Sequence, residues 1–355
     1  MATTQSRGKI ESIAMLRGMA IICIVYEHSA FSLWNKLYSG GLANFLFTQF
    51  IPRWTAIFVF ISGFLFYYLS DRYNTKKYYF TKFKNVIVPY FIISAISYLV
   101  LAHHQLAQLS IGFSDPSHNI FVWLVKNLVF GTINTPLWFI PMIIMIFVLG
   151  PWLYRISREN LVFIAIASLI FVNFYHRPPY TYGPILNAVF FLPYYIVGMC
   201  VCQHKQWIMD QGWKHYPMLI CLTLFTFLVS TLRFFHFNVY PWVSYDDNLQ
   251  IFLLGLIFFI LFEKIDIPNG PKRLLIRVGE TSFATFFIHY LFVIMFVKIL
   301  FAHENLFSGI IHTTSGTVTF LTYSVICFTT VAICHFIAVL MKKLFGRYSR
   351  YMIGY

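Results

Sequence analysis

One apolar run near the N-terminus carries three ionisable side chains, which makes it the first candidate for chemistry. The run MLRGMAIICIVYEHSAF contains Arg17, Glu27 and His28 among residues that are otherwise mostly apolar. Ionisable groups inside a membrane-spanning segment are expensive to bury, so each is a candidate for function. Arg17 and His28 are eleven residues apart, which in an α-helix is about 16 Å of rise and a rotation of only about 20°. The two side chains are therefore expected on one face of the same helix.

This spacing suits an extended substrate that has a charged end and a reactive end. A cation at one membrane face could hold phosphates while an imidazole deep in the membrane meets the far end of the molecule. Acyl-coenzyme A has this shape, and its phosphates could lie at Arg17 and at Lys82 and Lys84 of a second basic segment. His28 would then be either the general base on an acceptor hydroxyl or the group that takes the acyl chain itself.

Each of these residues also has a purely structural interpretation. Arg17 could be an ordinary positive charge at the cytoplasmic face, and His28 a polar residue that hydrogen-bonds a neighbouring helix. Glu27 is a second costly group and a catalytic candidate beside His28. It lies about 80° from the face of Arg17, however, and could instead orient a neighbouring helix.

The helices that must position these residues follow from the composition. Of 355 residues, 59% are apolar and 11% charged, and the mean hydropathy is +0.70, which no water-exposed surface could sustain. Recurrent apolar runs predict about ten transmembrane helices. These are expected near residues 13–33, 54–70, 85–102, 137–154, 160–175, 185–202, 216–234, 248–262, 281–301 and 318–341. We expect a single all-α integral membrane domain over residues 1–355, with no soluble domain.

The basic residues predict how these helices are oriented. With both the N- and C-termini in the cytoplasm, 20 of the 26 Lys and Arg residues fall in cytoplasmic segments, as the positive-inside rule requires. The net charge of +14 is then explained by the lipid bilayer, and no nucleic-acid partner is needed. The chain is expected to be a multi-pass protein of the cell inner membrane.

The predicted extracytoplasmic loops differ in kind, because they are rich in His, aromatic and hydroxyl residues. Aromatic faces stack on sugar rings, although an aromatic belt at the membrane interface enriches the same residue types. Arg53, at the outer end of the second predicted helix, could bind an anionic or hydroxylated acceptor or could snorkel to the interface. No metal-ligand spacing is present, so metal-independent chemistry is expected. The predicted extracytoplasmic loops are residues 103–119, 176–184, 233–248 and 302–316.

Several segments together resemble a known family. LRGMAIICIVYEHS followed by FVFISGFLFYY resembles the start of the membrane-bound acyltransferase-3 family, whose arginine, ten spacer residues and histidine fall on Arg17 and His28. The Ser-Gly-Phe motif of the family falls on residues 62–64, where small residues are expected to allow close helix approach. TPLWFIPMI with Trp138, FFLPYYIVGM, and SFATFFIHYLF with His289 resemble later family motifs, in family order.

The resemblance implies an enzyme that takes acyl groups, usually acetyl, from cytoplasmic coenzyme A and transfers them to glycans outside the membrane. Acetyl-CoA would be the donor and a hydroxyl of O-antigen, capsule or exopolysaccharide the acceptor. His28 and Glu27 would be catalytic. The remaining assignments are Arg17, Lys82 and Lys84 for the donor, and Arg53, His289 and Trp138 for the acceptor.

The second basic segment departs from the family pattern. Family members often carry two arginines three apart before the proline that opens the third helix, whereas TKFKNVIVPYF has Lys82 and Lys84, with Asn85 in place of the second arginine. Lysine point charges can bind phosphate, but the bidentate recognition of arginine is lost. Some relatives also carry a fused hydrolase-like domain. Here either the chain acylates the glycan directly or a separate transferase partner completes the reaction.

Two functions of other classes also fit the sequence. A carrier or flippase for a polysaccharide or lipid-linked sugar would need the same helices and aromatic loops, but it should show repeated halves with paired broken helices, and no repeat stands out. A membrane scaffold in a glycan-assembly complex should tolerate alanine at both Arg17 and His28.

Overall fold

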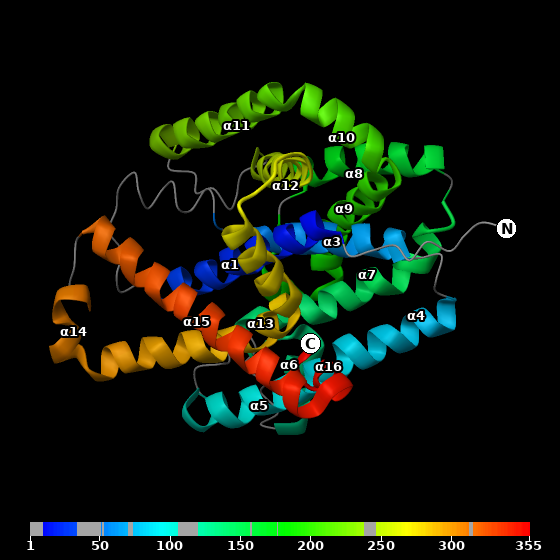
Figure 1. Ribbon diagram of the computed structural model, residues 1–355. Coiled ribbons are helices and arrows are strands. Elements are labelled where there is room, and N and C mark those ends of the chain that lie inside the picture. Colours follow the sequence, from blue (N-terminus) through cyan, green and yellow to red (C-terminus); the bar gives the residue numbers. More distant parts are fainter. Residues whose placement is uncertain are drawn as a thin grey trace.

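The structure is a computed structural model, and every regular element that it describes is helical. The described residues are 10–33, 51, 53–69, 74–105, 120–156, 158–175, 177–237, 246–311 and 315–355. Figure 1 shows a bundle of long helices in which α1 (Glu11–Leu33) lies centrally. Most residues of α1 are buried. The candidate residues Arg17, Glu27 and His28 are half-buried on this otherwise buried helix.

The other helices follow in chain order. They are α3 (Trp54–Leu69), α4 (Thr75–Lys82), η2 (Phe83–Ile87), α5 (Val88–Gln105), α6 (Ile120–Phe130), η3 (Thr135–Trp138), α7 (Phe139–Leu153), α8 (Arg158–Phe174), η4 (Tyr180–Tyr182), α9 (Pro184–Gln203), α10 (Lys205–Lys214), α11 (Tyr216–Phe237), α12 (Asp246–Lys264), α13 (Asn269–Ala302), α14 (Glu304–Ile311), α15 (Gly316–Phe345), η6 (Gly346–Tyr348) and α16 (Ser349–Ile353).

Two helix pairs make the most extensive contacts, and both are built on facing glycines. A Cβ atom on Gly18 of α1 would lie 2.1 Å from the carbonyl oxygen of Leu275, and one on Gly279 of α13 would lie 2.0 Å from that of Ala14. The backbones of α1 and α13 therefore touch directly. Small residues at such crossings are what allow helices to pack closely without a side chain between them.

The pair formed by α3 and α9 repeats this arrangement. A Cβ atom on Gly63 would meet the carbonyl oxygen of Tyr195 at 2.0 Å, and one on Gly198 would meet that of Phe60 at 2.0 Å. Ser62 donates a hydrogen bond to the carbonyl of Phe58 within its own helix, at 2.9 Å. The expectation that the Ser-Gly-Phe segment supports close helix approach is confirmed.

The ten predicted spans all coincide with helices, but fewer helices pass a strict test of length and hydropathy. Among the described residues, six candidate spans are long and apolar enough to cross a membrane, and the pair α10 and α11, bent by 79°, would make seven. How many helices cross, and on which side the termini lie, stay predictions. The six are Glu11–Leu33, Thr75–Val100, Thr135–Leu153, Pro184–Gln203, Asn269–Ala302 and Gly316–Ile353.

Among the described residues, four α-helices have no counterpart in the sequence-based prediction: α6, α10, α14 and α16. The longest of them, α6, has 11 residues, or about 16 Å, roughly half the thickness of the hydrocarbon core of a bilayer. A search for runs of about twenty apolar residues does not detect helices of this length. The predicted loop residues 106–119, 176, 238–245 and 312–314 lie outside the described residues.

The ninth predicted span is a much longer helix than expected. α13 begins at Asn269, whereas the apolar window predicted a start near residue 281. Its first turns are polar, so hydropathy alone does not include them. One of these polar residues, Lys272, forms an ion pair with Glu11 at 2.7 Å. The beginning of α13 is thereby joined to the beginning of α1.

The third predicted span also starts earlier in the structure. α4 begins at Thr75, where the side chain of Asn74 accepts a hydrogen bond from the backbone N–H of Lys77 at 2.7 Å. Residues 83–87 form a π-helical turn that continues into α5. Such turns insert an extra residue into a helix and often mark functional sites. Lys84 lies on this turn.

The glycine contact predicts a marked sensitivity to one added methyl group. Gly279→Ala would put a Cβ atom 2.0 Å from the backbone of α1, and overpacking of this kind costs about 1–3 kcal/mol. We expect a lower melting temperature in detergent, measured by the dispersity of the purified protein after heating. Gly270→Ala is the matched control in the same helix, because nothing lies within 4 Å of its Cβ position. Equal melting temperatures for the two variants would contradict this account.

Candidate active site

Two histidines from the α1 and α13 pair meet at the centre of the candidate site. The ring of His28 lies 5.2 Å from the ring of His289 and 5.6 Å from that of Tyr290, measured between centroids. His28 is half-buried, whereas His289 is completely buried. Of the two imidazoles, only His28 is open to a substrate.

The hydrogen bonds of His289 fix which of its nitrogens carries the proton. Its Nδ1 lies 3.0 Å from the carbonyl oxygen of Thr285 and 2.9 Å from that of Phe286. Carbonyl oxygens only accept hydrogen bonds, so Nδ1 is the protonated nitrogen and Nε2 of the neutral ring has a free lone pair. Nε2 is buried and makes no hydrogen bond within the described part of the chain. His289 thus offers an acceptor beside the ring of His28.

Glu27 faces a different set of groups, which includes two arginines. The charges of Arg177 and Arg53 both act on its carboxylate, and the backbone N–H of Arg53 hydrogen-bonds it. Arg53 is buried and has a φ of 80°, which is a left-handed backbone conformation that residues other than glycine rarely adopt. Strain of this kind persists only where the surroundings enforce it and is frequent at functional sites. The carboxylate of Glu27 is a contact of the strained residue.

Arg177 is the residue of this site that the sequence did not single out. Its guanidinium lies 5.4 Å from the ring centroid of Trp138 and 5.6 Å from that of Phe191. A guanidinium stacked on aromatic rings keeps the N–H edges of its plane accessible. The available signal was an arginine in a short loop, between α8 and α9, that also holds two prolines and three tyrosines.

The short helix η3 connects the two parts of the site. Thr135 donates a hydrogen bond to the hydroxyl of Tyr290 at 3.2 Å, at the His28 side. Trp138 at the end of η3 packs against Phe191 with tilted ring planes and lies under Arg177. Gly131 has a φ of 71°, and a Cβ there would meet the backbone of Trp138 at 2.5 Å, so this turn needs glycine. The TPLW segment therefore holds Trp138 beside Arg177, and its assignment to the acceptor stays a prediction.

Arg17 lies at the other end of the contact between α1 and α13. Its Nε donates a hydrogen bond to the carbonyl oxygen of Gly279 at 2.6 Å. Gly279 and His289 are ten residues apart on α13, which is about 15 Å along a helix. Arg17 and His28 thus both face α13, as their spacing predicted.

The two lysines of the second basic segment do not join Arg17. The ammonium of Lys82 lies 3.6 Å from the ring centroid of Phe147, and that of Lys84 lies 4.2 Å from that of Phe80 and 5.6 Å from that of Tyr351. Within the described part of the chain, neither lysine contacts Arg17. A phosphate held by all three would have to bridge between elements.

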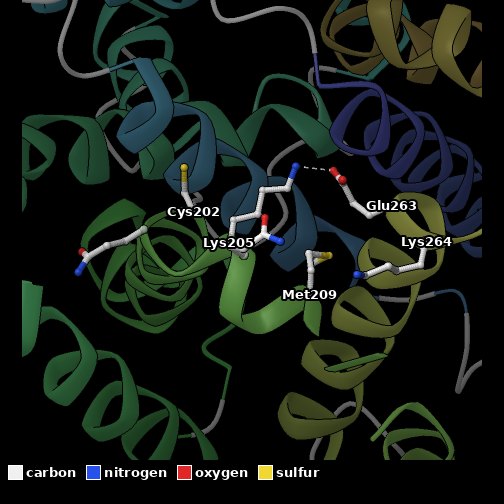
Figure 2. Close-up of a pocket in the computed structure, with 7 residues that line it drawn as sticks. Cys202, Lys205, Met209, Glu263 and Lys264 are labelled. Atoms are coloured by element: carbon white, nitrogen blue, oxygen red, sulfur yellow. Dashed lines mark ion pairs between the residues drawn. The ribbon is translucent and has the colours of Figure 1, made fainter. Parts of the chain in front are cut away.

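A polar pocket of about 340 Å³ lies elsewhere, between α9, α10 and α12. In Figure 2 the amine of Lys205 points to Glu263, with which it forms an ion pair at 2.7 Å. Ser12 of α1 donates a hydrogen bond to the same carboxylate. None of the residues assigned from the sequence lines this pocket. The other charged lining residue, Lys264, forms an ion pair with Asp210 at 3.2 Å, so each lysine has a counterion, which is typical of a structural network.

Comparison with known families identifies the family of the chain. The sequence profile of an acyltransferase domain, that of the acyltransferase-3 family, matches residues 10–339. The chain belongs to the acyltransferase-3 family. It is therefore a membrane acyltransferase in the general sense, and its long apolar helices make it a multi-pass membrane protein. No curated protein and no solved structure shows a significant match to the chain.

The burial of the two histidines predicts different chemical reactivity. Diethyl pyrocarbonate should modify His28, which is half-buried, and should leave the fully buried His289 unmodified until the protein is unfolded. Peptide mass spectrometry of the purified protein before and after unfolding in detergent measures both rates. Equal reactivity of the two rings in the folded protein would show that His289 is not enclosed as described.

Proposed function

We propose that the protein is a membrane O-acyltransferase, most simply an O-acetyltransferase, that transfers the acyl group of acyl-CoA to a hydroxyl of an extracytoplasmic glycan. The observation that carries the proposal is the half-buried His28 between two cationic ends. Arg17 lies on the same helix face at one end, and the group formed by Glu27, Arg53, Trp138 and Arg177 lies at the other.

The donor half of the proposal rests on the distance between Arg17 and His28. A guanidinium binds phosphate by charge-assisted hydrogen bonds, and the pantetheine arm of acyl-CoA would extend along α1 and α13 toward His28. Lys82 and Lys84 would add positive charge near the same face. Acetyl is proposed as the acyl group because family resemblance favours it.

The chemical step needs a base at the thioester and the acceptor hydroxyl. His28 would remove the proton of the hydroxyl as its oxygen attacks the thioester carbonyl carbon. The carbon–oxygen bond forms, the carbon–sulfur bond breaks, and the imidazolium returns the proton to the leaving thiolate. The same residue could instead carry the acyl group between the two partners. Both routes need His28 unprotonated at the start.

His289 is better suited to positioning His28 than to binding the acceptor itself. It was assigned to the acceptor from the sequence, yet it is completely buried and its ring lies against that of His28. Its Nε2 lone pair could accept a hydrogen bond from an N–H of His28, which would select the tautomer and orientation of the base. An acceptor sugar would then contact His28 and not His289.

The acceptor half of the proposal rests on Trp138, Arg53 and Arg177. The aromatic face of Trp138 and the N–H edges of the stacked Arg177 suit a sugar that bears hydroxyl or carboxylate groups. Glu27 would hold these arginines in place and could also bond an acceptor hydroxyl. O-antigen, capsule and exopolysaccharide all present such groups, and transfer would be direct unless a partner protein completes it.

The first test is mass spectrometry of surface glycans from cells that express wild type, His28→Ala or Arg17→Ala at matched membrane levels. We expect an acetyl-sized mass increment on a sugar in the wild type, and its loss in both variants. Unchanged modification in both variants would refute the proposed site. Altered glycan export with no change in mass would instead favour a carrier for polysaccharide or lipid-linked sugar.

A second test addresses Arg177. With the acceptor fragment found by mass spectrometry, Arg177→Ala should raise the KM for acceptor about tenfold, since tenfold corresponds to about 1.4 kcal/mol, and should leave the KM for acyl-CoA unchanged. Lys298→Ala is the control, because Lys298 is exposed and lies on the same predicted side. An equal rise in both KM values would mean that Arg177 supports the fold and does not bind the acceptor.

A further inference from the structure

Two arginines from opposite ends of the chain lie beside α13: Arg17 donates a hydrogen bond to the carbonyl oxygen of Gly279, and α16, which carries Arg350, packs against the same helix. Arg350 of α16 is within electrostatic range of Arg17 of α1. The one hydrogen bond of Arg17 goes to the backbone of Gly279, and within the described part of the chain neither guanidinium forms an ion pair. Like charges that approach without a counterion repel one another. An anion between them would remove this repulsion.

The segment that carries Arg350 is folded onto the helices and is not a loose tail. α16 contacts α5, η2, α13 and α15, and it is drawn in red beside α5 in Figure 1. Ser349 and Ile353 are buried, and Ser349 hydrogen-bonds the carbonyl oxygens of Gly346 and Tyr355. A Cβ on Gly354 would lie 2.6 Å from the ring of Phe283. Arg350 is therefore held at a defined position.

The same segment also contacts the second basic region. Tyr351, next to Arg350, lies under the ammonium of Lys84 on the π-helical turn, at 5.6 Å from the ring centroid. The short helix α16 thus carries one cation, Arg350, and lies near two more, Arg17 of α1 and Lys84 of η2. Arg350 is exposed and Arg17 is half-buried, so a solute can reach them. The charged side chains of the pocket in Figure 2 differ, since Lys205 and Glu263 neutralise each other there.

We propose that Arg350, together with Arg17 and Lys84, forms the binding site for the phosphates of the nucleotide part of the acyl donor. This inference rests on the proposed function and deepens it. Arg350 supplies a second planar set of N–H donors, which a lysine cannot. The C-terminal helix is then part of the donor site, and α16 closes the gap between Arg17 and the π-helical turn.

The test is direct binding to the full-length protein purified in neutral detergent. Isothermal titration with coenzyme A and with 4′-phosphopantetheine would compare wild type, Arg350→Ala and Arg347→Ala. The control residue Arg347 is on the adjoining turn and is exposed, and its side chain is stacked on Tyr348. We expect Arg350→Ala to weaken the binding of coenzyme A about tenfold and the binding of phosphopantetheine much less. Arg347→Ala should weaken neither. Arg350→Gln gives the same test if the alanine variant does not purify.

The outcomes separate this inference from the proposed function. Wild-type affinity for coenzyme A in the Arg350 variants would overturn the inference alone, provided that His28→Ala still abolishes acyl transfer. An equal loss of affinity for coenzyme A and for phosphopantetheine would also overturn it, because Arg350 would then not bind the nucleotide phosphates. The inference would also be overturned if the Arg350 variants lost affinity only in nanodiscs that contain phosphatidylglycerol. That result would identify a lipid phosphate as the ligand. Failure of the wild type both to bind coenzyme A and to transfer acyl groups would refute the proposed function.

Discussion

The direct contact between the backbones of α1 and α13 is the constraint on which the rest of the candidate site depends. Gly18 and Gly279 leave no room for a side chain between the two helices, so the residues above and below them are brought together as well. Arg17 reaches the carbonyl oxygen of Gly279, and His28 meets the ring of His289. A separation of even one methyl group would weaken both contacts together. The positions of Arg17, at the proposed donor end, and of the two central histidines are thus set by one packing interaction.

The sequence predicted those features that depend on the spacing within one helix. Arg17 and His28 share a face because eleven residues are close to three full turns, and the small residues of the Ser-Gly-Phe segment indicated close packing. Trp138 and His289 were chosen as candidates because they stand in recognisable motifs, and their roles stay predictions. Every predicted span falls on a helix, since apolar runs of this length have few other ways to satisfy their backbone groups in a bilayer.

What the sequence could not predict are contacts between distant segments. Arg177 approaches Glu27 across about 150 residues of chain, and Arg350 approaches Arg17 across more than 300. Each was only one of many basic residues that the positive-inside pattern already explained. The burial of His289 likewise depends on neighbours from other helices. Its motif therefore marked His289 as a site candidate but did not show whether the ring would be buried or exposed to substrate. Short helices such as α16 were missed because their apolar content is too small to detect.

The length of α13 has a consequence for which donors the site can accept. Its contacts with Arg17 and with His28 lie on one unbroken helix of 34 residues, and no hinge separates them. The distance between the two contacts is therefore fixed at about 15 Å by the helical rise. Under the proposed function, a donor whose arm differs in length would present its thioester above or below the imidazole. Variation in the acyl group itself has to be accommodated beyond His28, so selectivity for chain length and selectivity for the carrier are set in separate places.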